Sequence, residues 1–340
     1  MNIYAHAGAG MLSLAVRHAL HLIYVPNSMS NSVDEIDPRT FKVVRHFAVG
    51  VRPQHVVPAY DLKMLYVLNN HSNTITPIDP LTGNPGRPIP VADPYNMYFT
   101  PNGRYAIVVA EALDRLDFRE PHTFALQHSL PVPCTGVNHM DFSRDGSIAV
   151  ASCEFSGTLL KIDVRHPAVL AKLLLPRVHA AKPQRQTPKP QDVKLSPDGK
   201  IYYVADGHAN GIWEISAAGR GLKIVGFLPT GRGAHGLYPS RNAHSLYVTN
   251  RLAGTISVVN FRTRKITSTF HIPGGSPDMG GVSASGHTIW VAGRYNAQVY
   301  AIDTLTGKLL ARIPVGKSPH GLCVWPQPGR YSLGHTGVMR

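Results

Sequence analysis

Seven short segments of the chain carry a polar side chain at corresponding places, each just after a turn. They read PQH (53–55), PYN (94–96), VNH (137–139), PQD (190–192), GAH (233–235), SPD (276–278) and SPH (318–320). The polar residues are four imidazoles, two carboxylates and one amide: His55, His139, His235, His320, Asp192, Asp278 and Asn96. Imidazole nitrogen and carboxylate oxygen are ligands of Zn, Cu, Fe and Mn. We therefore predict that the six His and Asp residues are metal ligands or acid/base groups, provided that the fold brings them together.

Two other interpretations of these segments stay open. The polar side chains would equally line an unmetallated channel that holds water or a ligand, or form hydrogen bonds at the starts of strands. The register is a further question, because His235, Asp278 and His320 align one position earlier than the others. Adjacent strand residues face opposite ways. Either glycines such as Gly236 and Gly321 let the backbone shift, or only one set reaches the shared centre.

A second group of polar residues follows apolar pentapeptides that end in loops. Glu154 is a candidate general base and Arg294 a candidate anion clamp, and we predict both as catalytic. The predicted ligand-binding residues are Asn96, Glu111, His71, His208, Arg251 and Tyr295. For each loop residue, an ordinary solvated position is the alternative.

Several kinds of chemistry have no support in the sequence. A G-x-S-x-G elbow, a Walker loop, a dinucleotide fingerprint and an H-E-x-x-H motif are all missing. C-x-x-C-H is missing too, so we predict no covalent haem and no nucleotide cofactor, and a transition metal, Cu or Zn, as the cofactor. Cys134 and Cys153 would form a disulfide, a soft ligand pair or two buried thiols, of which buried thiols are favoured, and Cys323 is expected to pack in a strand.

An internal repeat defines the elements that must position these residues. A β-rich pentapeptide ends at residues 27, 69, 110, 153, 206, 250 and 293, so the copies are 41 to 44 residues apart except for one interval of 53. Each copy has a short strand before it and two alternating strands after it, with Asp, Pro or Gly turns between them. Four antiparallel strands per repeat are typical of a propeller blade. The sequence predicts an all-β, seven-bladed β-propeller, in which the inner strand starts and the pentapeptide loops share one face of the channel.

The pentapeptide carries a family resemblance. LYVTN (246–250) and its degenerate copies, such as LYVLN (65–69) and IWVAG (289–293), resemble the YVTN family of seven-bladed β-propellers. The resemblance covers nearly the whole chain and implies this fold and an extracytoplasmic location. For function it implies only a range, because such propellers include surface-layer proteins, lactonases, lyases and the metal- or haem-bearing domains of redox enzymes.

Ring closure is predicted from the two ends of the chain. Residues 320–326 form a good inner strand and are predicted to complete the blade begun by residues 21–50. The rival is that MLSLAV (11–16) takes that place. The predicted division is an N-terminal extension (1–20), the propeller (21–326) and a C-terminal tail (327–340).

The interval of 53 places one insertion at residues 165–191. Arg177, Lys182, Arg185 and Lys189 lie there among prolines. The segment is either a solvated basic loop, which is favoured, or a docking loop for an anionic ligand.

Composition limits the partners. The 34 Lys and Arg residues exceed the 20 Asp and Glu residues, which gives a net charge of +14 and attracts anions. The basic residues are scattered, which favours a solvated surface over nucleic-acid binding. No apolar run reaches the roughly 18 residues of a membrane span, and residues 1–20 lack the basic start of a signal peptide. We expect a monomer.

Two classes of function remain. The first is a propeller with a His/Asp-rich ligand- or metal-binding site at the mouth of the axial channel, acting as an enzyme of redox, lyase or hydrolytic type on a small molecule or anion. The second is a non-catalytic binding or scaffold propeller of the cell envelope. The first is favoured by a small margin.

Overall fold

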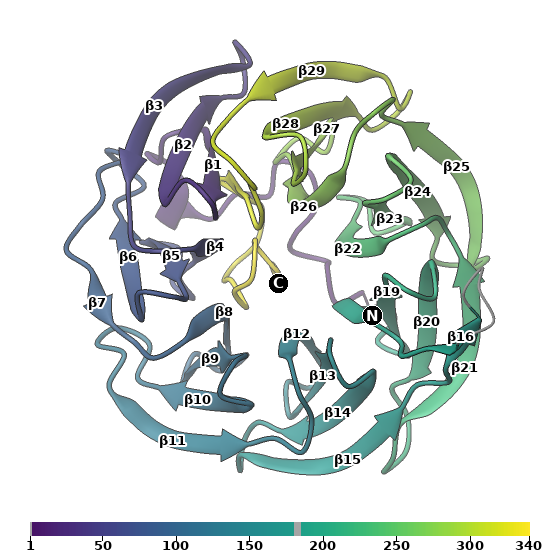
Figure 1. Cartoon of the computed structure of the whole chain (residues 1–340). Coiled ribbons are helices and arrows are strands. Elements are labelled where there is room, and N and C mark those ends of the chain that lie inside the picture. Colours follow the sequence, from purple (N-terminus) through teal and green to yellow (C-terminus); the bar gives the residue numbers. More distant parts are fainter. Residues whose placement is uncertain (1, 180–184) are drawn as a thin grey trace.

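The chain forms a closed ring of seven four-stranded antiparallel sheets (Figure 1), as the repeat predicts. The computed structural model describes residues 2–179 and 185–340. In each sheet the strands run in order from the channel outward, so each repeat contributes a radial blade. Sheets that pack in this way bury both faces and leave short edges.

The strands of the first three blades have the following bounds, from the axis outward. The closing blade contains β30 (Cys323–Trp325), β1 (Leu22–Asn27), β2 (Ser32–Asp37) and β3 (Lys42–Ala48). The next contains β4 (Pro53–Pro58), β5 (Leu65–Asn69), β6 (Thr74–Ile78) and β7 (Ile89–Pro90). The third contains β8 (Pro94–Phe99), β9 (Ala106–Ala110), β10 (Arg115–Arg119) and β11 (Leu126–Pro131).

The other four blades repeat this order. They contain β12 (Val137–Phe142), β13 (Ile148–Cys153), β14 (Thr158–Asp163) and β15 (Ala168–Leu174); then β18 (Pro190–Leu195), β19 (Ile201–Asp206), β20 (Gly211–Ser216) and β21 (Lys223–Pro229). The last two contain β22 (Ala234–Pro239), β23 (Ser245–Asn250), β24 (Thr255–Asn260) and β25 (Lys265–His271); then β26 (Pro277–Val282), β27 (Thr288–Gly293), β28 (Gln298–Asp303) and β29 (Leu309–Pro314).

The pentapeptides are the second strands, and their burial explains their composition. β5 and β9 are buried along their whole length, whereas the outer strand β21 alternates between exposed and half-buried residues. Both faces of a second strand meet a neighbouring blade, so β-branched and aromatic residues fill it. The Asp turns follow from local hydrogen bonds: the Asp163 carboxylate accepts from the backbone N–H groups of Arg165 and His166.

The C-terminal strand closes the ring, as predicted. β30 pairs antiparallel with β1, with Tyr24 opposite Cys323. The rival arrangement is wrong: Leu14–Val16 form the short 3-10 helix η1, and Leu12 makes a bridge to Gly329 instead.

The tail beyond β30 turns back into the channel, where the C-terminus lies in Figure 1. The Phe99 N–H donates to the Leu333 carbonyl at 3.0 Å, and the His335 N–H donates to the Met97 carbonyl at 2.8 Å. At the end of the chain, Arg340 pairs with the buried Asp141 at 2.8 Å. The division into extension, propeller and tail stays a prediction, but these contacts fix the tail to the inner strands.

The insertion and the cysteines complete the fold. Within the insertion, β16 (Val178–His179) pairs with β17 (Arg185–Gln186), and Lys182 lies outside the described residues. Cys134 and Cys153 form a disulfide, so the preference for two buried thiols is wrong, and Cys323 is a buried free thiol as expected. Among the described residues, no helix is long and apolar enough to span a membrane.

Candidate metal centre

Each inner strand from β4 to β26 begins with a β-bulge beside the channel. The pairing of β4 with β5 shifts between Pro53 and His55, and the same kind of shift occurs at the starts of β8, β12, β18, β22 and β26. A bulge places two residues of one strand opposite a single residue of its partner strand, which changes the direction of their side chains. Neighbouring positions at a strand start can therefore both face the axis.

Both registers of polar residues do lie at the axis. The ring of His139, from the later register, is 5.7 Å from that of His55 and 6.4 Å from that of His235, which belongs to the earlier register. His320 lies 4.9 Å from His55 and 5.8 Å from His235. Glycine allows this approach: a Cβ on Gly321 would come within 2.1 Å of the His55 ring. The register question is thus answered by the bulges and by one close glycine contact.

Three histidines converge closely enough to share one ion. His55, His139 and His335 each offer a ring nitrogen, and these atoms lie within 4.8 Å of one another. The Nε2 atoms of all three are buried and have no hydrogen-bond partner in the part of the chain that the structure describes. An unsatisfied buried polar atom costs about 1–3 kcal/mol, so the unsatisfied nitrogens of three neighbouring imidazole rings favour a ligand there. We call these residues the His triad.

His335 was not predicted from the sequence. It lies in the tail, outside the repeat, where its ring stacks on Tyr98 at 5.9 Å. Gly334 has a φ of +91°, and a Cβ there would come within 2.4 Å of the Met97 carbonyl oxygen. The sequence feature that could have indicated His335 is its position in a Gly-rich segment, GHTG, which is not part of the blade pattern.

The Nδ1 atoms of the His triad face polar groups. His55 Nδ1 lies 2.8 Å from the Tyr95 carbonyl oxygen, to which it donates. The Asn96 amide nitrogen lies 3.1 Å from His139 Nδ1 and 3.0 Å from His335 Nδ1. Asn96, a predicted ligand-binding residue, therefore orients two rings of the triad.

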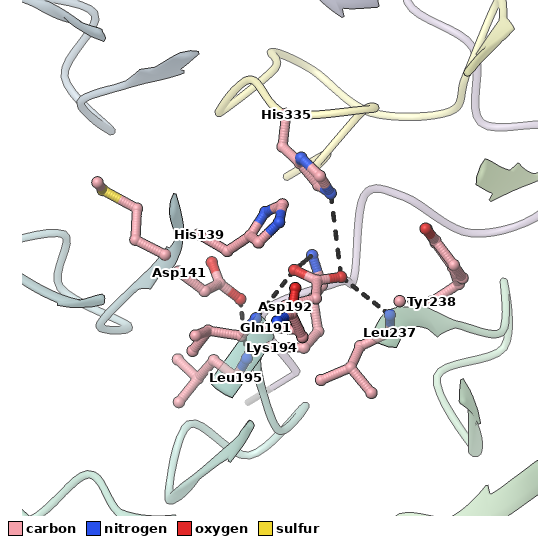
Figure 2. Close-up of polar contacts among 12 residues, drawn as sticks. His139, Asp141, Gln191, Asp192, Lys194, Leu195, Leu237, Tyr238 and His335 are labelled. Atoms are coloured by element: carbon pink, nitrogen blue, oxygen red, sulfur yellow. Dashed lines mark hydrogen bonds and ion pairs between the residues drawn. The ribbon is translucent and has the colours of Figure 1, made fainter. Parts of the chain in front are cut away.

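Asp192 lies near His139 and His335, two members of the triad, as Figure 2 shows. Its Oδ2 atom accepts a hydrogen bond from the Leu237 N–H at 2.9 Å and lies 3.9 Å from His335 Nε2. Its Oδ1 atom lies 3.9 Å from Lys194 Nζ. Burial raises the pKa of Asp192 to about 6, against the opposing effect of Lys194. The carboxylate is therefore ionised at neutral pH and favours a cation nearby.

Burial lowers the pKa of every histidine at the axis. The pKa of His55, His139, His235 and His335 falls well below the usual value, and that of His320 falls to about 4. Arg294 adds to the effect on His320 by charge repulsion. Neutral imidazole is the form that binds metals, so the triad is ready for a metal at neutral pH.

Asp278 forms a second polar centre, toward the mouth of the channel where the inner strands begin. It lies 2.6 Å from His320 Nδ1, 3.3 Å from His235 Nδ1 and 3.0 Å from Arg251 Nη1, with Arg294 Nη1 at 3.7 Å. Burial alone would raise the pKa of Asp278, but His235, Arg251 and His320 hold it well below its usual range. His235, His320 and Asp278 thus make contacts with one another rather than joining the triad.

The other predicted loop residues divide into two groups. Glu154 pairs with Lys189 at 2.8 Å, and burial raises the pKa of Glu111 to about 8, with Glu154 acting in the same direction. Both carboxyl groups thus belong to one cluster at the mouth. Tyr295 is exposed and faces Arg251. His71 and His208 are exposed as well, and no described contact joins them to the His triad.

Comparisons with known proteins agree on the fold. Hydrazine synthase from Kuenenia stuttgartiensis is similar with a TM-score of 0.71 and 19% identity, over 84% of this chain and 93% of that chain. A functionally unknown protein from Desulfotomaculum acetoxidans gives 0.69 and 13%, over 90% and 99%. The dihydro-heme d1 dehydrogenase NirN, in complex with DHE, gives 0.65 and 13%, over 90% and 75%. At these identities the likeness concerns the fold alone.

Sequence comparison gives the family. No curated protein sequence matches the chain. A family model described as YNCE-like beta-propeller matches residues 3–329, nearly the whole chain, in agreement with the YVTN-type repeats. This protein therefore belongs to the family of YNCE-like β-propellers.

Proposed function

We propose that this protein binds one transition metal ion, Cu or Zn, on the Nε2 atoms of His55, His139 and His335, and acts as an enzyme on a small molecule that enters through the mouth. The observation that carries this proposal is the convergence of three buried histidines, which each offer a ring nitrogen within 4.8 Å of the others, and whose Nε2 atoms have no hydrogen-bond partner among the described residues. This set replaces the predicted six-residue set, since the three histidines that meet the distance criterion are His55, His139 and His335. His235 and His320 instead lie beside Asp278, and Asp192 lies 3.9 Å from His335 Nε2.

The spacing suits a metal after a small adjustment. Zn–N bonds of 2.0–2.1 Å in a tetrahedral site put the nitrogen atoms about 3.3 Å apart. The triad nitrogens lie within 4.8 Å of one another, so binding would draw them together by at most about 1.5 Å. Small rotations of the imidazole rings supply such a change.

A metal at Nε2 also requires a proton on each Nδ1 atom. His55 already donates from Nδ1 to the Tyr95 carbonyl. His139 and His335 face the amide nitrogen of Asn96, whose Oδ1 accepts from the Met97 N–H. Rotation of this amide by 180° would present Oδ1 to both rings. The rotation would leave the buried Met97 N–H without its acceptor and end the donation from Asn96 to the Asn138 carbonyl. The unsatisfied N–H costs about 1–3 kcal/mol, which is small compared with metal binding.

Three histidines leave a coordination position open for water or substrate, which favours a catalytic over a structural metal site. Zn would lower the pKa of a bound water and support hydrolytic or lyase chemistry, whereas Cu would support redox chemistry. In this proposal Glu154 is the group that accepts a proton, and Arg294 is the group that holds a substrate charge. The disulfide supports the extracytoplasmic location that the family resemblance implies. The absence of haem and nucleotide stays a prediction.

Metal content tests this proposal. Untagged, metal-free protein is loaded with Zn²⁺ or Cu²⁺, desalted and analysed by mass spectrometry. Wild-type protein should retain one equivalent, and His335→Ala less than a tenth of that. The control, His271→Ala, changes an exposed histidine on β25 and should retain one equivalent. Wild-type protein that retains neither metal, or His335→Ala that retains a full equivalent, would contradict the proposal and favour the non-catalytic scaffold.

A further inference from the structure

The two arginines at the mouth share a single carboxylate. Arg251 Nη1 lies 3.0 Å from Asp278 Oδ1, and Arg294 Nη1 lies 3.7 Å from Asp278 Oδ2. Both arginines come from loops that follow second strands, β23 and β27, and Asp278 lies at the start of β26. One carboxylate balances one guanidinium, so this centre has one positive charge in excess.

The surrounding groups do not balance that charge. His235 and His320 lie beside Asp278, and an imidazole group can add positive charge to this centre but cannot neutralise it. Glu154 is already paired with Lys189 at 2.8 Å. Glu111 has a pKa of about 8, raised by burial, and is mostly protonated at neutral pH. The mouth therefore attracts an anion.

The guanidinium groups also have donors to spare. Arg251 Nε and Arg294 Nη1 are buried and have no hydrogen-bond acceptor among the described residues. The two side chains are 14% and 23% exposed, while Asp278 is fully buried, so the arginines lie on the solvent side of the carboxylate. Tyr295 is 61% exposed and lies over Arg251 at 5.5 Å. Solvent thus contacts part of both arginine side chains, and this exposed part is where a small anion would approach them.

We propose that Arg251 and Arg294 form an anion subsite at the mouth, which binds the carboxylate of a monoanionic organic substrate. The inference rests on the proposed function, because it names the substrate class of that same site. A planar carboxylate matches the donor geometry of guanidinium. A single excess charge favours a monoanion over a dianion such as phosphate. His320 links the subsite to the triad, since it contacts Asp278 on one side and lies 4.9 Å from the ring of His55 on the other.

The test measures anion binding by the full chain with and without metal. Acetate and phosphate are titrated calorimetrically in chloride-free buffer, first against metal-free protein, so that an effect of the metal on the anion is excluded. Wild-type protein should bind one acetate, and phosphate at least tenfold more weakly. Arg294→Gln leaves Arg251 to balance Asp278, so that the fold is kept, and should weaken acetate binding at least tenfold. Arg251→Lys keeps the charge but loses the planar fork, and should weaken it by a smaller factor.

The control is Arg312→Met, because Arg312 lies over Tyr300 at 5.4 Å much as Arg251 lies over Tyr295, but is in the outer strand β29. It should bind acetate like wild-type protein. Equal acetate binding by wild-type and Arg294→Gln protein, no saturable acetate binding, or tighter binding of phosphate would overturn the inference. Metal content separates the two proposals: Arg294→Gln should keep one equivalent of metal, whereas His335→Ala should lose the metal and still bind acetate.

Discussion

Gly321→Ala should displace His55, a proposed metal ligand, by adding one methyl group. The new Cβ would lie 2.1 Å from His55 Cδ2 and 2.7 Å from Cγ. The backbones cannot move apart easily, because Val56 N–H donates to the Gly321 carbonyl and Gly321 N–H to the Gln54 carbonyl, both at 2.9 Å. The His55 ring must therefore turn away, which breaks its bond to the Tyr95 carbonyl.

The size of the effect follows from these contacts. Carbon atoms pack at about 3.5–4.0 Å, so the 2.1 Å approach is at least about 1.4 Å too short. Overpacking of this kind costs about 1–3 kcal/mol, and the lost hydrogen bond about 1 kcal/mol. The free energy of unfolding should fall by about 2–4 kcal/mol. To bind metal, His55 must return against a strain of the same size, so metal affinity should fall about 30- to 700-fold, since 1.4 kcal/mol is a factor of ten.

Gly281→Ala is the matched control. It adds the same methyl group on the inner strand β26, where the nearest atom, Val324 Cγ2, lies at an ordinary 3.4 Å. Urea unfolding followed by Trp fluorescence gives the stability, and Zn²⁺ titration of metal-free protein gives the affinity. If the two variants matched each other in both measurements, the close approach of His55 to Gly321 would not constrain the site.

Two further predictions concern regions outside the His triad. Burial raises the pKa of Glu35 in β2 to about 7, so the folded state keeps a proton that the unfolded state releases above about pH 4.5, and stability should fall as pH rises through 7. Between pH 5 and 8, the free energy of unfolding of Glu35→Gln should fall by about 2 kcal/mol less than that of wild-type protein. Parallel stability profiles for the two proteins would contradict this sign. The Cys134–Cys153 disulfide spans 19 residues in sequence, so replacing both cysteines with Ser should lower the free energy of unfolding by about 3 kcal/mol. A loss below about 1 kcal/mol in chemical denaturation would show that the crosslink contributes little.

The repeat predicted the fold because its signals are local. Strand alternation and Asp turns recur within each blade, and the number of copies gives the number of blades. The register at the axis could not be predicted in this way, because a bulge such as that between Pro53 and His55 does not change the two-residue alternation of the sequence. The disulfide was missed for a similar reason, since Cys134 precedes its strand and its distance to Cys153 depends on how the loop folds back.

His335 could not be found from the repeat because its position depends on tertiary contacts alone. The tail has no period, and it is held by hydrogen bonds to Met97 and Phe99 and by the pairing of Arg340 with Asp141. These contacts span most of the chain length, so no local pattern encodes them. A histidine outside a repeat is thus worth examining wherever the repeat itself leaves a polar channel.

The tail also explains how a seven-fold ring can build the proposed three-ligand site. Blades arranged evenly around an axis present their polar residues in a wide circle, whereas one small ion needs ligands about 3.3 Å apart. His335 reaches the axis from the tail and approaches both His55 and His139, at ring distances of 5.2 and 5.0 Å. The tail follows β30, the strand that closes the ring. A metal on the triad would therefore bind only the closed ring with its tail docked, and would stabilise that state by about 4 kcal/mol at a thousand times its dissociation constant.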